Sequence, residues 1–139
     1  MLVEVEKVFS DAVTARTLYL AQLERADRVL SSLRKLFVNN KIKREEIFIP
    51  IKIPCDNEKH VAHILTLVDL MIHHQHKDGA WDYGEDNLDA LTMLKIIKEN
   101  SNELVRAAKE FTEKEVEKTK QIKEFLDAVE AELKDIQTP

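Results

Sequence analysis

Apolar residues recur at alternating steps of four and three along the N-terminal part of the chain. The series comprises Val5, Phe9, Ala12, Tyr19, Leu23, Ala26, Leu30, Leu33 and Phe37. Because an α-helix makes one turn in about 3.6 residues, this spacing keeps a single apolar stripe on one side of a helix, as bundles and coiled coils require. The pattern predicts a helix over residues 3–38 whose stripe packs against another helix.

One charged residue interrupts the stripe. Arg16 stands between Ala12 and Tyr19, where the neighbouring stripe positions are apolar. A buried guanidinium needs a carboxylate or an anionic ligand beside it, which makes Arg16 a candidate for binding an anionic ligand or cofactor. The alternative, which we favour, is that the helix extends beyond its partners there and the long side chain reaches water.

Residues 39–56 do not continue the helical pattern. Isoleucines and a phenylalanine surround Pro50 and Pro54 in the segment EEIFIPIKIPCD. Proline fixes φ and lacks a backbone donor, so these two residues exclude a helix interior. We expect an extended apolar crossover, with room for a short edge strand, that spans the length of a bundle and covers an open face of its core.

Three further helices are predicted after the crossover, over residues 57–76, 85–111 and 113–136. The last two carry apolar seams, which comprise Ala90, Leu94, Ile97, Leu104, Ala108 and Phe111, and then Ile122, Leu126, Val129, Leu133 and Ile136. Gly79 suits the turn after the first of these helices. A capping box of Thr112 with Glu115, bracketed by Phe111 and Val116, predicts where the last helix begins. Two alternatives stay open: a boundary near residue 100, in the polar run ENSNE, or one continuous helix paired as a coiled coil between chains.

Four helices joined by one long connection define an all-α fold, a four-helix bundle that occupies residues 1–139 as a single domain. The architecture resembles ferritin-like and cobalamin adenosyltransferase-like folds by analogy only. A ferritin-like metal site uses a Glu-x-x-His motif on two helices. That motif is absent from segment 57–76, and no histidine occurs in the other three helices. The resemblance therefore implies an architecture and no activity.

All five histidines fall within residues 60–76. On a helix, His60 and His63 share one face, and Asp69 and His73 share another, so each pair has the spacing of two metal ligands. These four residues are our metal candidates. The interpretation we favour is structural, because histidines near the C-terminus of a helix interact favourably with its dipole. No cofactor is predicted, and a divalent metal is the alternative.

Composition limits the classes of partner. The chain has a net charge of −5, which argues against general nucleic-acid binding, although residues 28–44 carry six basic residues and no acid. That basic patch lacks the interleaved aromatic residues that stack on bases. The single cysteine, Cys55, fits a reducing cytoplasm, and we expect neither a signal peptide nor a membrane span. The high content of Lys, Glu and Ile is typical of thermophiles.

The leading functional hypothesis is association rather than catalysis. The seams are long, and the chain has no glycine-rich phosphate loop and no nucleophile elbow. We expect a small cytoplasmic protein that forms a homo-oligomer or binds a protein partner. The alternative is a four-helix bundle that binds a metal through the histidines of segment 57–76 or an anionic ligand through Arg16. One form of this alternative is an enzyme.

Overall fold

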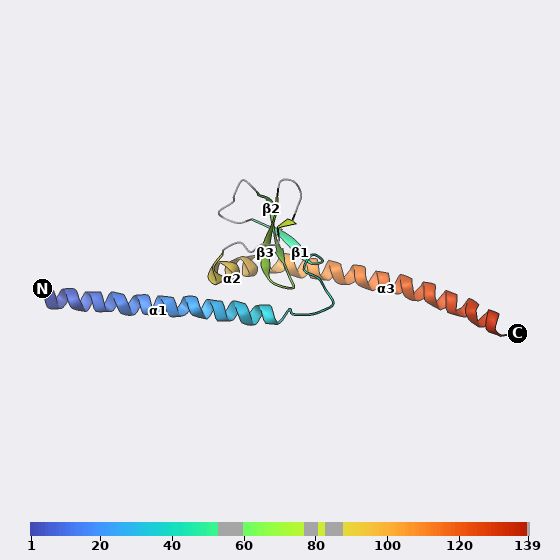
Figure 1. Ribbon diagram of the computed structural model, residues 1–139, viewed down its shortest axis with the longest axis horizontal. Coiled ribbons are helices and arrows are strands. Elements are labelled where there is room, and N and C mark those ends of the chain that lie inside the picture. Colours follow the sequence, from blue (N-terminus) through green and yellow to red (C-terminus); the bar gives the residue numbers. More distant parts are fainter. Residues whose placement is uncertain (53–59, 77–80, 83–87, 139) are drawn as a thin grey trace.

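The computed structural model describes residues 1–52, 60–76, 81–82 and 88–138 and is markedly elongated (Figure 1). Its elements are three helices and four strands. In chain order they are α1 (Leu2–Lys35), β1 (Phe48–Ile51), β2 (His60–Thr66), β3 (Met71–His76), β4 (Trp81–Asp82), α2 (Ala90–Glu99) and α3 (Ser101–Gln137).

The sheet, α2, the last turns of α1 and the first turns of α3 form one body, which we call the central module (described residues 23–111). Two helical segments leave it in opposite directions (Figure 1). We call residues 2–22 outer α1 and residues 112–137 outer α3. The four-helix bundle predicted from the sequence is therefore wrong: the fold is mixed, with three helices and a small antiparallel sheet among the described residues.

The long N-terminal helix is confirmed as α1. It ends in Arg34 and Lys35, whose positive charge favours the C-terminal end of the helix dipole. The chain then turns at Asn39, whose Oδ1 accepts hydrogen bonds from the N–H groups of Lys41 and Ile42 at 2.8 and 2.6 Å. Asparagine is common in turns for this reason.

The helix predicted over residues 57–76 is wrong, because its described part forms the hairpin of β2 and β3. The four strands are antiparallel in the order β1-β2-β3-β4. Ile64 and Leu65 point to opposite faces of β2, yet both are buried. A strand covered on both faces shows no polar alternation, so its apolar run is easily mistaken for a helix.

The predicted crossover contains the edge strand β1. Ile49 and Ile51 are buried while Pro50, at the sheet edge, is exposed. Proline is tolerated there because an edge strand leaves one row of its backbone groups without strand partners. Ile49 pairs with Leu65, and Leu65 with Ile72, which places the strand in a sheet instead of across a bundle. Residues 53–56 of the predicted crossover lie outside the described residues, as does Gly79.

The predicted helix boundary at Thr112 is also wrong, because α3 continues through it. The Thr112 hydroxyl donates to the Ala108 carbonyl at 2.9 Å, a bond that a threonine forms readily inside a helix. The observed break is at Asn100, within the polar run, where Nδ2 donates to the Ile96 carbonyl at 2.8 Å. Asp89 caps the start of α2 by accepting from the Thr92 N–H at 2.7 Å.

The main core lies between one face of the sheet and the three helices. It contains buried side chains from α1, β1, β2, β3, α2 and α3, which are Ala26, Leu30, Ile49, Ile51, Leu65, Ile72, Ala90, Met93, Ile96 and Leu104. Only the second half of the α1 stripe contributes to it. The first half of the stripe lies on outer α1 and is exposed.

Candidate functional site

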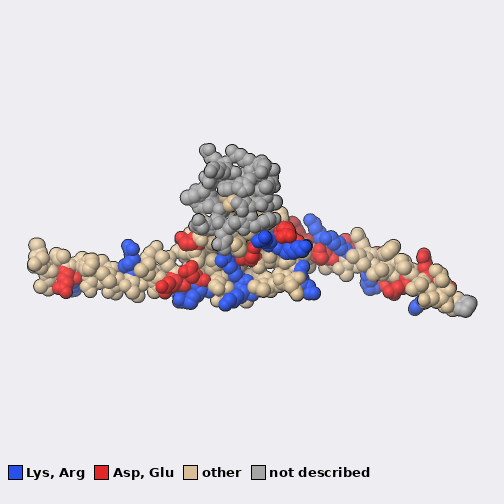
Figure 2. Space-filling model, viewed as in Figure 1, with Lys and Arg blue, Asp and Glu red and all other residues tan. Residues whose placement is uncertain are grey.

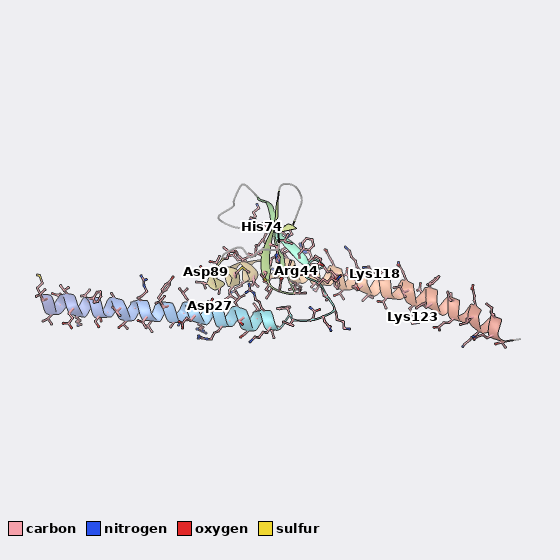
Figure 3. The ribbon with its side chains drawn as sticks, in the orientation of Figure 1. Asp27, Arg44, His74, Asp89, Lys118 and Lys123 are labelled. Carbon is pink, nitrogen blue, oxygen red and sulfur yellow. The ribbon has the colours of Figure 1, made fainter. Side chains whose placement is uncertain are left out.

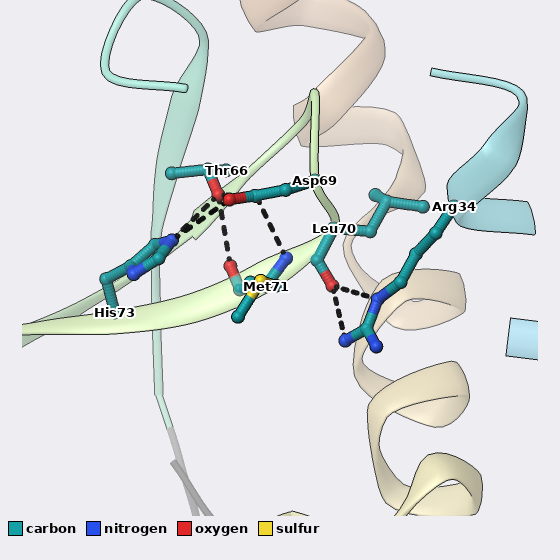
Figure 4. Close-up of polar contacts among 6 residues, drawn as sticks. All are labelled: Arg34, Thr66, Asp69, Leu70, Met71 and His73. Atoms are coloured by element: carbon teal, nitrogen blue, oxygen red, sulfur yellow. Dashed lines mark hydrogen bonds and ion pairs between the residues drawn. The ribbon is translucent and has the colours of Figure 1, made fainter. Parts of the chain in front are cut away.

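The turn between β2 and β3 holds the most closely connected polar cluster among the described residues (Figure 4). The Thr66 hydroxyl donates to Asp69, whose Oδ1 also accepts from the Met71 N–H at 3.2 Å. His73 Nε2 lies 3.1 Å from Thr66 Oγ1 and 3.5 Å from Asp69 Oδ2. The predicted pair of Asp69 and His73 is thus brought together, although a strand turn does so and not a helix.

This cluster lacks the geometry of a catalytic triad. Thr66 has one hydroxyl proton, and because it donates that proton to Asp69, the contact with His73 requires His73 Nε2–H to be the donor. A triad needs the opposite polarity, with the histidine accepting the proton and the carboxylate on its other nitrogen. Thr66 and His73 are also fully buried, out of reach of a substrate.

The cluster also falls short of a metal site. Asp69 and His73 supply two ligands, whereas protein-bound zinc is usually held by at least three protein ligands. The part of the chain that the structure describes contains no group of three His, Cys, Asp or Glu residues placed to hold a metal ion. What the contacts of Thr66, Asp69 and His73 do is close the β2–β3 turn.

Arg34 fastens α1 to the same turn. Its Nε and Nη2 both donate to the Leu70 carbonyl oxygen, at 3.3 and 3.1 Å (Figure 4). Leu70 has a φ of 49°, in the left-handed region, which costs a residue with a Cβ about 1–2 kcal/mol. Its side chain is almost completely buried, and that burial together with the Arg34 contact offsets the cost.

The other predicted site residues do not converge. His63 and His74 face each other across β2 and β3, with ring centroids 6.1 Å apart and ring planes at 72°. The side chain of His60 lies outside the described residues, so the pairing of His60 with His63 has no described geometry. Arg16 is exposed on outer α1.

The basic patch predicted at residues 28–44 begins on the last turns of α1 and continues into the chain that follows it. Arg34 is engaged with Leu70. Figure 2 shows Lys and Arg side chains of the central module next to acidic ones. Among the described residues, no helix has both the length and the hydropathy needed to cross a membrane.

An apolar groove of about 300 Å³ lies where α1 ends and α3 begins. Its lining includes Leu33, Phe37, Leu70, Leu104, Val105 and Ala108. The last two belong to a stripe that continues along α3 into outer α3. The groove therefore brings residues from the end of the α1 stripe together with residues from the start of the α3 stripe.

The exposed apolar stripes of the two outer helices are the largest feature without an explanation in the fold. Phe9 and Tyr19 on outer α1 are 68% and 57% exposed. On outer α3 the seam predicted from the sequence, from Ile122 to Ile136, is exposed throughout. The sequence predicted both seams and placed them in a single-chain bundle, with a coiled coil between chains as the alternative for the C-terminal seam. We take them as the candidate functional site.

No protein-family model matches the chain, and neither a curated protein nor a solved structure is significantly similar to it.

Proposed function

We propose that the protein acts by self-association, with the stripes of outer α1 and outer α3 as the contact surface and with no catalysis of its own. A single observation carries this proposal. On one and the same stripe of α1, Leu30 is 5% exposed and Phe9 is 68% exposed. Apart from Arg16 the stripe is uncharged over its whole length, but the chain covers only the half next to the sheet.

The energetics of helix packing favour a partner for the exposed half of the α1 stripe, on outer α1. Most helical stability in proteins comes from packing an amphipathic face, and the outer segments pack no such face within their own chain. Fully burying one large apolar side chain stabilises a protein by about 1.5–3 kcal/mol. Exposed apolar patches of such length mark interaction surfaces in soluble proteins.

The polar face of outer α3 also indicates that the apolar seam, and not the rest of the helix surface, is the contact surface. Lys123 projects from the helix (Figure 3) and forms an ion pair along it with Asp127 at 2.7 Å. Such pairs, three or four residues apart, are typical of a solvated helix face. They leave the apolar seam as the surface that favours contact.

The molar mass in solution tests the proposal. Light scattering coupled to size-exclusion chromatography, over a dilution series, should give at least twice the 16.1 kDa of one chain. Leu126→Glu places a charge in the seam and should shift the protein towards the monomer, because a charge is costly to bury in an apolar contact.

The matched control is Ala128→Glu. It introduces the same side chain two residues further along outer α3, about 200° around the helix from Leu126 and off the seam. The control should associate as the unchanged protein does. A strict monomer for the unchanged protein at all concentrations would contradict the proposed function.

A further inference from the structure

The seams of the two outer helices share one seven-residue repeat, and each contains one charged residue. Stepping back by sevens from Leu126 gives Thr119, Thr112 and Val105, and from Ile122 it gives Glu115 and Ala108. Glu115 is thus the one charged residue in the α3 seam from Val105 to Ile136. Arg16 is the one charged residue in the α1 stripe.

The position of each charge in the repeat selects one way of pairing. In coiled-coil notation, where the two seam positions are a and d, Arg16 is an a residue and Glu115 is a d residue. Parallel helices pair a with a and d with d, whereas antiparallel helices pair a with d. If two α1 helices or two α3 helices pair, Arg16 and Glu115 meet an uncharged residue or their own like charge. Only antiparallel pairing of α1 with α3 brings the two charges into one layer.

The register that joins Arg16 to Glu115 also gives every other seam residue of outer α1 an uncharged partner on outer α3, and Leu133 and Ile136 extend beyond the aligned segment. The layers it forms are Leu2 with Val129, Val5 with Leu126, Phe9 with Ile122, Ala12 with Thr119, Tyr19 with Thr112, and Leu23 with Ala108. The aligned segments, from Leu2 to Tyr19 and from Thr112 to Val129, have the same length, about 26 Å.

The exposure of the seam residues within one chain changes at the point where the aligned layers begin. Leu23 and Ala108 are half-buried, and both lie where packing against the central module ends. Tyr19 and Thr112, one layer further out, are exposed. The register therefore begins where each helix leaves its own chain, a coincidence that the charge argument did not require.

The direction of the outer helices assigns the partner. Outer α1 and outer α3 of one chain extend away from each other, so they do not pair within that chain (Figure 1). A two-fold rotation about an axis perpendicular to the long dimension reverses a second copy. Its α3 then runs antiparallel beside outer α1, and its α1 beside outer α3, which forms the same contact twice.

Building on the proposed self-association, we propose a two-fold dimer in which outer α1 of each copy pairs antiparallel with outer α3 of the other, in the register set by Arg16 and Glu115. Glu115 contacts Lys118 at 3.2 Å within its own helix, but both side chains are about half exposed or more, so that contact contributes little. In the dimer Glu115 leaves Lys118 and pairs instead with Arg16 of the other copy inside the seam, where a charge pair fixes the register.

Charge reversal tests the contact between copies. Arg16→Glu and Glu115→Arg should each weaken dimerisation about tenfold or more, because each places like charges in both layers of its own dimer. Mixing the two variants should restore the affinity of the unchanged protein, because both layers of the mixed dimer then hold opposite charges. A mixture that associates no better than either variant alone overturns the proposal.

Cross-linking tests the register. In a Cys55→Ser background, chains carrying Ala12→Cys are mixed with chains carrying Thr119→Cys and oxidised. The expected product is a covalent mixed dimer, because these positions face each other in one layer. The control pairs Ala12→Cys with Leu126→Cys, one repeat away, and should cross-link much less. Links between two Ala12→Cys chains, or equal yields for both pairs, overturn the proposed pairing.

The two proposals fail in different ways. If the unchanged protein is an oligomer but mixing rescues nothing and the predicted cross-link is absent, the antiparallel register is wrong while self-association holds. If the unchanged protein is a monomer, self-association itself is wrong. A cross-link that forms only within single chains carrying both Ala12→Cys and Thr119→Cys also overturns the dimer, in favour of pairing inside one chain.

Discussion

Leu30 and Phe9 occupy equivalent positions of one helical stripe, three heptads apart, and their surroundings differ completely. Leu30 packs in the core between α2 and the sheet, whereas Phe9 is exposed on outer α1. The local sequence is equally suited to packing at both places. What differs is whether a neighbour from the same chain is present. The comparison teaches that a heptad pattern specifies a contact without specifying which chain supplies it.

The largest expected difference between the two regions follows from truncating a leucine in each. Leu65→Ala removes a fully buried side chain from the central module and should lower the free energy of unfolding by about 2–5 kcal/mol. Leu126→Ala, on outer α3, should leave unfolding of the sheet almost unchanged in the monomer and weaken association instead. Native-state hydrogen exchange at the backbone amides of β2 measures the stability of the sheet.

The comparison between central module and outer helices fails if the two variants behave alike. An equal loss of sheet stability for Leu126→Ala, measured well below the concentration at which dimers form, would show that outer α3 supports the central module directly. Helix content from circular dichroism separates this result from simple fraying of the outer helix, because fraying lowers helix content and leaves hydrogen exchange at the β2 amides unchanged.

A smaller effect is expected where α1 is fastened to the sheet. Arg34→Met keeps most of the side chain's length but removes two hydrogen bonds to the Leu70 carbonyl, which lies in a left-handed turn. The free energy of unfolding should fall by about 1–3 kcal/mol, because a carbonyl at a partly buried contact loses a charged donor. Arg28→Met, an exposed arginine on the same helix, is the control and should change it by less than about 0.5 kcal/mol. Equal effects of the two changes would mean that the Leu70 contact adds nothing.

The smallest expected effect concerns pH and the cap of α2. The hydrogen bond from the Thr92 N–H lowers the pKa of Asp89 below its ordinary value of 3.8. A lowered pKa means that ionised Asp89 stabilises the fold above that value, and that this contribution is lost as the pH falls through the pKa in the folded state.

Asp89→Asn keeps a side chain that caps a helix but does not titrate. The difference in melting temperature between the unchanged protein and this variant should therefore shrink below pH 3.8. Comparing the two proteins cancels the titration of all other carboxylates. A difference that stays constant with pH would show that the charge of Asp89 contributes nothing to the cap.

Sequence reasoning succeeded where structure is local and failed where it depends on distant residues. The extent of α1 follows from its repeat, and the break near Asn100 lies in the polar run that was one of the predicted alternatives. The sheet was missed because Ile64 and Leu65 are both buried, which removes the alternation that identifies a strand. The boundary at Thr112 was wrong because a cap motif and a helix-interior threonine have the same sequence signature.

Part of the candidate site could be predicted from the sequence. Both seams and the exceptional Arg16 can be read directly from the order of residues, and so can the spacing of Asp69 and His73. The sequence could not show that Asp69 and His73 meet Thr66 in a buried turn, since that contact depends on strand pairing. Nor could it show that half of the α1 stripe lies outside the core.

By itself the sequence determined a long N-terminal helix, amphipathic heptad stripes near both ends of the chain, and an apolar, proline-containing segment that cannot be helical. These properties follow from interactions among residues a few positions apart. The tertiary structure alone decided that the middle of the chain forms a sheet, that α2 covers only the second half of the α1 stripe, and that the outer helices point in opposite directions. Burial depends on which distant segments come together, and no local pattern encodes that choice.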